Sequence, residues 1–233
     1  MKSLLHRIPA RVLTLLSAVV ILAFMSSVES FSAETTYTIW SGTTVPGVAD
    51  SGPDDAVEVG VKFRSDVNGT ITGIRFYKGV GNTGTHVGNL WSSSGTLLAS
   101  ATFTGETSSG WQQVSFASPV AITANTVYVA SYHTTVGHYS YNLNYFATTG
   151  VDSPPLHALA NGVSGVNGVF AYGSSSTFPN QGWNSTNYWV DAAFIPAISA
   201  TLQSFSVTPG NPTISTGAAS SSRLRGHTAT GAR

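Results

Sequence analysis

Two stretches of the sequence, residues 139–145 and 178–189, interleave aromatic rings with asparagine amides. Sugar rings stack their apolar C–H faces on aromatic planes, whereas their hydroxyls need amide or carboxylate partners. Rings in segments rich in Gly and Asn are the candidates for ligand contact, because such segments form loops. The predicted ligand-binding residues are Tyr139, Tyr141, Asn144, Tyr145, Trp183 and Asn184. Four other rings lie within strand patterns and are expected in the core: Trp91, Trp111, Tyr128 and Trp189.

An acidic segment, residues 50–58, is the candidate metal site. Calcium takes oxygen ligands from carboxylates and backbone carbonyls, and this segment offers several carboxylates close together, although their spacing is not that of an EF-hand loop. The predicted metal ligands are Asp50, Asp54, Asp55, Glu58 and, from the last predicted strand, Asp191. We expect them to hold a structural Ca²⁺; the alternative is that residues 50–58 form a solvated acidic turn.

Evidence for catalysis is thin. His133 and His138 flank a turn and would give three zinc ligands if Asp152 joined them, but histidines in such turns also make ordinary hydrogen bonds. Glu106 and Asp152 are isolated carboxylates of the kind that a glycosidase pair requires. The sequence contains no Gly-x-Ser-x-Gly elbow, phosphate loop or His-Glu-x-x-His motif. We therefore predict no catalytic residues.

The elements that must position these side chains are strands. Apolar residues alternate with other residues from residue 58 to 64, so Val59, Val61 and Phe63 are expected to face one side. Further strands are predicted at residues 69–78, 87–92, 97–104, 111–117, 126–134, 168–173 and 188–195, and turn residues separate them. Residues 135–185 contain only one clear strand and are expected to form long loops. The pattern predicts an all-β fold, a two-sheet antiparallel β-sandwich of the jelly-roll type.

Charge is distributed unevenly along the 233 residues. The chain has 10 Lys and Arg and 10 Asp and Glu, but residues 34–200 hold four basic and nine acidic side chains, a formal charge of −5. An acidic domain lacks the basic face that binding to nucleic acid requires. With no cysteine, the chain has no disulfide and no cysteine-ligated zinc, so its core must be held by packing alone.

The two ends differ from the middle. Residues 1–33 combine Lys2, Arg7 and Arg11 with an apolar run at 12–25, which predicts a secretory signal peptide and a domain that is not membrane-bound after cleavage. Residues 34–200 are expected to form the sandwich. Residues 201–233 begin with a segment similar to the first strand of a bacterial immunoglobulin-like domain. They are too short to complete such a domain, so we expect a disordered tail.

Several ordered motifs carry a family resemblance. They include residues 59–66 (VGVKFRSD), 71–78 (ITGIRFYK), 84–91 (GTHVGNLW), 110–116 (GWQQVSF) and 187–191 (NYWVD). Residues 37–196 resemble the bacterial secreted domain of unknown function 4082. The resemblance implies a secreted domain that is covalently linked, in longer relatives, to immunoglobulin-like and polysaccharide-acting modules. Its activity is not established.

The function expected from these observations is a secreted, non-catalytic module that binds extracellular polysaccharide or cell-surface glycan. One alternative is a structural spacer in a surface adhesin. A second is a glycan-acting hydrolase or lyase that uses Glu106, Asp152 or the histidines.

Overall fold

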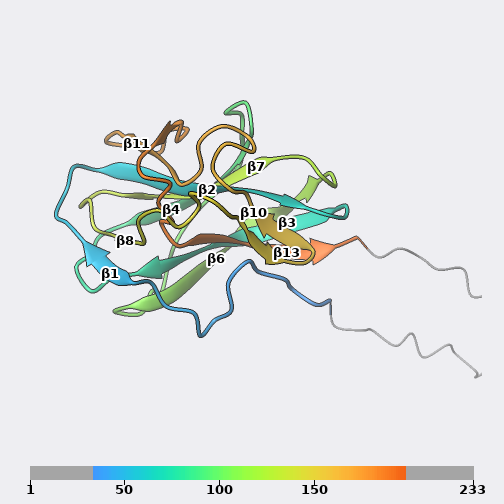
Figure 1. Ribbon diagram of the computed structural model, residues 1–233. Coiled ribbons are helices and arrows are strands. Elements are labelled where there is room, and N and C mark those ends of the chain that lie inside the picture. Colours follow the sequence, from blue (N-terminus) through green and yellow to red (C-terminus); the bar gives the residue numbers. More distant parts are fainter. Residues whose placement is uncertain (1–33, 198–233) are drawn as a thin grey trace, which may run out of the picture. The chain divides into compact units, whose positions relative to one another are not determined.

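The structure, a computed structural model, describes residues 34–197, which form thirteen strands (Figure 1). The strands are β1 (Val48–Ser51), β2 (Val57–Ser65), β3 (Gly69–Lys78), β4 (His86–Ser92), β5 (Leu97–Thr102), β6 (Gly110–Ile122), β7 (Tyr128–Thr134), β8 (Tyr139–Tyr141), β9 (Val151–Ser153), β10 (Leu156–Ala158), β11 (Val169–Tyr172), β12 (Gln181–Gly182) and β13 (Val190–Pro196). In this part of the chain no helix has the length and apolarity that a membrane span requires. The predicted signal peptide and the immunoglobulin-like strand with its tail lie outside the described residues.

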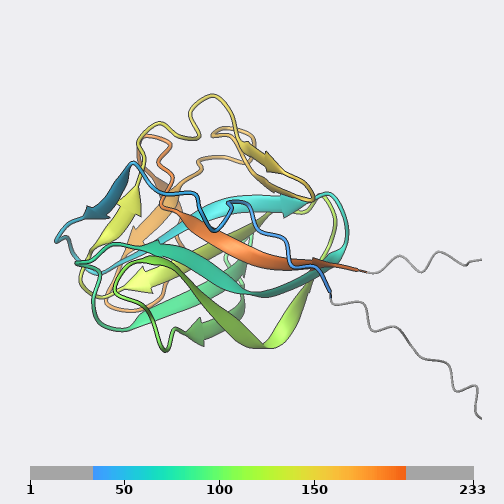
Figure 2. The same cartoon turned by 90° about the horizontal axis from the view of Figure 1, so that it is seen from below.

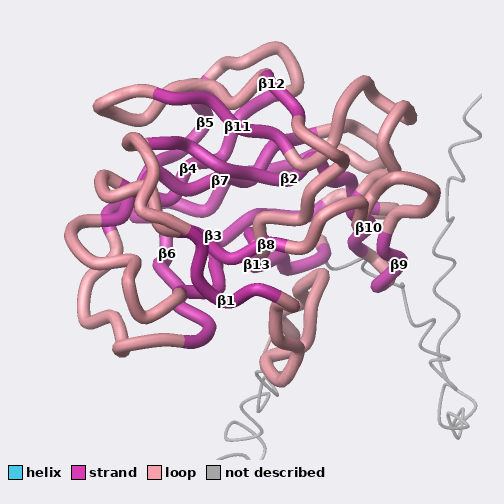
Figure 3. The backbone as a smooth tube through the Cα atoms, turned by 60° about the vertical axis from the view of Figure 1, so that its left-hand side comes forward, coloured by secondary structure: helices cyan, strands magenta, loops and turns pink. Residues whose placement is uncertain are grey.

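Two antiparallel sheets form opposite layers, which confirms the predicted all-β sandwich (Figure 3). The larger sheet has the order β12-β11-β2-β7-β4-β5, and β10 pairs with both β2 and β9. The smaller sheet has the order β13-β3-β6, and a separate pair joins β1 to β8. The jelly-roll topology itself stays a prediction.

The core lies between the two sheets. Val59, Val61 and Phe63 of β2 are buried, as their alternation predicted. The ring of Phe76, from the smaller sheet, stacks on that of Tyr132, from the larger sheet, with centroids 4.0 Å apart. Large rings that bridge the layers supply much of the apolar area whose burial stabilises the domain.

A strap formed by residues 173–180 covers the other face of the larger sheet. The Phe178 ring packs edge-on against Trp91, with centroids 5.8 Å apart, and Val129 and Val169 complete this second buried cluster. Trp91 is therefore buried as predicted, but beneath the strap and not between the sheets. Tyr128 and Trp189 are buried in the main core, and Trp111 is half-buried against it.

Residues 135–185 are more regular than predicted, because they contain β8 to β12. These strands have only two to four residues each, too few for an alternating pattern to stand out from loop sequence.

The two ends of the described chain emerge side by side (Figure 2). Tyr37 and Phe194 exchange two backbone hydrogen bonds, with N···O distances of 2.7 and 2.9 Å. The segment that precedes β1 thus runs along β13, the edge strand of the smaller sheet.

Candidate functional site

A cleft of about 320 Å³ opens beside β2 and β11. In the antiparallel register, Phe170 lies opposite Val59 and Tyr172 lies opposite Val57. Directly paired residues point to the same face of a sheet, so these four side chains form one continuous apolar surface. Alternation along both strands thus brings two aromatic rings to the floor of the cleft.

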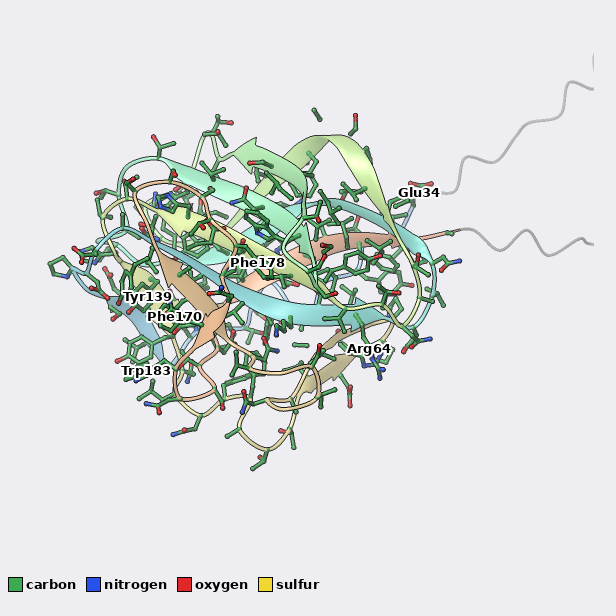
Figure 4. All side chains as sticks on the ribbon, turned by 90° about the horizontal axis from the view of Figure 1, so that it is seen from above. Glu34, Arg64, Tyr139, Phe170, Phe178 and Trp183 are labelled. Atoms are coloured by element: carbon green, nitrogen blue, oxygen red, sulfur yellow. The ribbon has the colours of Figure 1, made fainter. Side chains whose placement is uncertain are left out.

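Three further rings form the walls of the cleft. They are Tyr139 from β8, Trp183 from the turn after β12, and Tyr188 from the segment that enters β13. Tyr139 and Tyr188 pack edge-to-face with centroids 5.6 Å apart, which fixes one wall. Trp183 is 54% exposed and Tyr172 is 50% exposed, so both present ring surface to solvent. Figure 4 shows Tyr139, Phe170 and Trp183 gathered on one side of the domain.

A second pocket of about 120 Å³ adjoins the first. It shares Tyr139, Trp183 and Tyr188 with the main cleft and adds Tyr141, Ser51 and Thr186. Because three rings line both pockets, the two form neighbouring compartments of one elongated site, which we call the aromatic cleft.

One carboxylate stands in the aromatic cleft. Oδ2 of Asp54 accepts a 2.6 Å hydrogen bond from the hydroxyl of Tyr172, and Oδ1 accepts the backbone N–H of Asp55 at 2.8 Å. The bond to Asp54 raises the pKa of Tyr172 to about 12, and burial raises the pKa values of Tyr139 and Tyr188. The phenols are therefore neutral at physiological pH and can both donate and accept hydrogen bonds.

Comparison with protein families identifies the domain that carries this cleft. Residues 43–190 match the model of a family described as a domain of unknown function, DUF4082. The chain belongs to this family. The match contains every residue that lines the aromatic cleft. No curated protein matches the chain.

The DUF4082 domain brings three of the predicted ligand-binding residues together, namely Tyr139, Tyr141 and Trp183. Tyr145 lies elsewhere, since its ring packs against Trp189 with centroids 5.7 Å apart and its hydroxyl accepts a 3.4 Å hydrogen bond from Nε1 of Trp40. It belongs to a structural cluster because its strand-free segment folds inward, which loop composition does not reveal.

Asn144 and Asn184 do not line the cleft of the DUF4082 domain but join the two loops that flank it. The N–H of Asn144 donates to the carbonyl of Asn184 at 2.8 Å. Their φ angles are 58° and 46°, in the left-handed region that asparagine tolerates better than most residues. Both residues thus act through their backbones.

Sequence reasoning did not assign Phe170, Tyr172, Tyr188 or Asp54 to this site. The signal for the first two was present, because alternation across residues 169–172 places Phe170 and Tyr172 on one face. This face lines the cleft because β11 pairs with β2. The local sequence pattern does not reveal that pairing.

The five predicted metal ligands do not converge. Asp50 accepts hydrogen bonds from Nδ1 of His138 at 2.7 Å and from the N–H of Gly81 at 2.5 Å. Asp54 faces the cleft, Asp55 is exposed, and Glu58 is fully buried on the opposite face of β2 from Val57 and Val59, beneath the strap. Within residues 34–197 no group of three or more His, Asp and Glu residues is arranged to hold a metal ion.

Asp191 is a structural anion in the DUF4082 core. It accepts the backbone N–H groups of Ile39 at 2.9 Å and Trp40 at 3.2 Å, and its Oδ2 lies 3.3 Å from Nη1 of Arg75. Burial raises the pKa of this carboxyl to about 6, although the guanidinium and the N–H groups act in the opposite direction. Its carboxylate fastens the N-terminal segment to the smaller sheet, which explains why it does not join the acidic loop.

The candidates for catalysis occupy separate clusters. Glu106 lies 2.6 Å from Nζ of Lys78 and 2.8 Å from Nδ1 of His86. Nδ1 of His157 is 2.7 Å from Oδ1 of Asp152. His133 Nε2 is 2.8 Å from the carbonyl of Gly173 in the strap, and His138 binds Asp50. The structure therefore does not bring His133, His138 and Asp152 together, and neither Glu106 nor Asp152 lines the aromatic cleft.

Proposed function

We propose that this DUF4082 domain is a secreted, non-catalytic module that binds extracellular polysaccharide or cell-surface glycan in the aromatic cleft. One observation carries the proposal: six aromatic rings and one carboxylate line an elongated, solvent-open site, and two of the rings are about half exposed. Exposed ring faces accept the C–H faces of sugars, while phenol hydroxyls and Asp54 offer partners to sugar hydroxyls.

A binding role fits the lining better than a hydrolytic role does. Glycoside hydrolysis by the common mechanisms needs two carboxyl groups on either side of the scissile bond. Asp54 is the one acidic residue among the described residues that line the cleft. The spacer alternative, in turn, gives no reason for rings as large as those of Trp183 and Tyr172 to remain half exposed beside a cleft.

Affinity electrophoresis of the purified protein through gels that contain soluble polysaccharides tests the proposal. We expect retention by at least one glycan, and we expect Trp183→Ala to weaken it about tenfold, since a lost stacking contact is worth roughly 1–1.5 kcal/mol. Tyr37→Ala is the matched control, because this exposed ring lies beside β13 and outside the cleft. Equal retention of Trp183→Ala and wild type, or no retention by any glycan, would favour the spacer.

A further inference from the structure

We infer that the aromatic cleft selects glycans that carry protonated amino groups, and that Asp54 is the residue that recognises the ammonium. This inference rests on the proposed function and names the ligand class of the same site. It follows from three features of the cleft: the placement of charge around it, the free acceptor position of Asp54, and the exposed ring faces.

The negative charge of the cleft is not balanced by a cation. No Lys, Arg or His occurs among the described residues that line the two pockets. Arg75 is paired with Asp191, Lys78 is paired with Glu106, and Nζ of Lys62 donates to the carbonyl of Ser164 at 2.7 Å. Arg64, the remaining Lys or Arg of the described chain, lies far from Tyr139, Phe170 and Trp183 (Figure 4). An acidic glycan entering the cleft would therefore meet a carboxylate with no cation to offset the repulsion.

Asp54 can accept a further hydrogen bond. Its carboxylate oxygens receive bonds from Tyr172 and from the N–H of Asp55, and the hydroxyl of Tyr139 is a third partner within the protein. A carboxylate offers about four acceptor positions, so about one remains for a ligand. The residue is exposed, and its neighbour Tyr172 places a ring next to that free position. An ammonium, which is charged, suits this carboxylate better than a neutral hydroxyl does.

The ring faces favour the same group. A cation over the face of a Trp or Tyr ring is attracted by the negative charge of that face, and more strongly where water is excluded. Trp183, Tyr139 and Tyr172 surround the space in front of Asp54. A hexosamine unit presents a C–H face to such rings and its ammonium to the carboxylate. The second pocket is lined by Ser51, Thr186 and shared rings, without a carboxylate, and so suits an adjoining uncharged sugar unit.

The experiment compares two oligosaccharides that differ only in N-acetylation. Isothermal titration calorimetry of the purified protein at about pH 6 and low salt would use a glucosamine hexamer and an N-acetylglucosamine hexamer. We expect the glucosamine hexamer to bind about fivefold tighter or better, and added salt to reduce the difference.

Variants assign the preference to one residue. Asp54→Asn keeps an oxygen that can accept the Tyr172 bond but removes the charge, so we expect it to abolish the preference while binding of the acetylated hexamer persists. Asp55→Asn removes the adjacent exposed charge and should leave the preference intact.

The possible outcomes separate the two claims. Equal affinity for both hexamers, or binding of neutral glycans without binding of the glucosamine hexamer, overturns this inference and leaves the proposed function standing. A preference that survives in Asp54→Asn overturns the assignment to Asp54. No binding by any glycan, or binding unchanged by Trp183→Ala, overturns both claims.

Discussion

The hydroxyl of Tyr172 donates a 2.6 Å hydrogen bond to Oδ2 of Asp54, a residue 118 positions earlier in the chain. The bond ties the end of β11 to the loop before β2 and holds a ring and a carboxylate side by side at the cleft. Both residues are exposed, so the bond orients the two groups in water more than it stabilises the fold.

Removing this hydroxyl should weaken ligand binding without removing the ring. In Tyr172→Phe the stacking surface remains but Asp54 loses its orienting donor, so we expect glycan affinity to fall about threefold to fivefold, equivalent to roughly 1 kcal/mol. Calorimetry with the best-bound glycan measures this, and the melting temperature should change little. Tyr172→Ala should lose more, because the ring is then gone as well. Affinity equal to wild type in Tyr172→Phe would mean that the bond does not serve the site.

Breaking the buried ion pair should destabilise the domain. Asp191→Asn leaves the Arg75 guanidinium without its anion, at a site where it also lies 4.5 Å from the Trp111 ring centroid. Removing one partner of a buried pair costs about 3–5 kcal/mol of unfolding free energy, which urea denaturation measures. Asp55→Asn, at an exposed carboxylate, is the control and should change stability by less than about 0.5 kcal/mol. If Asp191→Asn lowers the free energy of unfolding by less than about 1 kcal/mol, Asp191 does not fasten the N-terminal segment to the smaller sheet as we describe.

Glu106 should matter for stability and not for ligand binding. Its carboxylate lies between Lys78 and His86, away from the aromatic cleft. Glu106→Gln keeps the shape but removes the charge, so we expect a loss of about 2 kcal/mol of stability with glycan affinity unchanged. Parallel denaturation and calorimetry on the same preparation check both parts. A selective loss of affinity, with stability retained, would instead place Glu106 at a ligand site.

Glu58 should make stability depend on pH. Burial beneath the strap raises its pKa from 4.5 to about 7, although Ser131 and Asn89 donate hydrogen bonds to it. Between pH 4.5 and about pH 7, Glu58 is protonated in the native state and ionised in the unfolded chain. The free energy of unfolding should therefore fall as pH rises through this window, by about 3 kcal/mol from this residue.

Glu58→Gln provides the matched comparison. A neutral amide removes the titration and can also donate toward Asn89 Oδ1, which accepts no hydrogen bond in the wild-type structure. We expect the variant to be more stable than wild type at about pH 8 and similar at about pH 5, by urea denaturation at both pH values. Asp191 titrates in both proteins, so the difference between them isolates Glu58. Parallel pH profiles for the two proteins would contradict the prediction.

Local patterns predicted the sheets well and the site in part. Alternation identified β2 and its buried face, and loop composition identified Tyr139, Tyr141 and Trp183 as neighbours of a possible ligand. Composition could not separate Tyr145, which turns inward onto Trp189. The orientation of a ring in a loop is decided by tertiary packing and not by its near neighbours in sequence.

Carboxylates were the harder part, because their roles depend on partners far along the chain. Asp191, a predicted metal ligand, accepts the N–H groups of residues 39 and 40, which lie some 150 positions away in the chain. Asp54, predicted beside it as a ligand, lines the cleft and accepts a hydrogen bond from Tyr172, 118 positions later. Pairings at such separation leave no periodic trace in the sequence.

The side-by-side ends of the domain decide how it would bear tension. If the domain is one of several covalently linked modules, a pulling force would act on residues 34 and 197. The force would break the two Tyr37–Phe194 hydrogen bonds one after the other. The next contacts to be loaded would be those that Asp191 makes to Ile39 and Trp40. The aromatic cleft, built from residues 51–59, 139–141, 170–172 and 183–188, lies outside this first line of force. The contacts that would yield first thus lie apart from the residues that line the aromatic cleft.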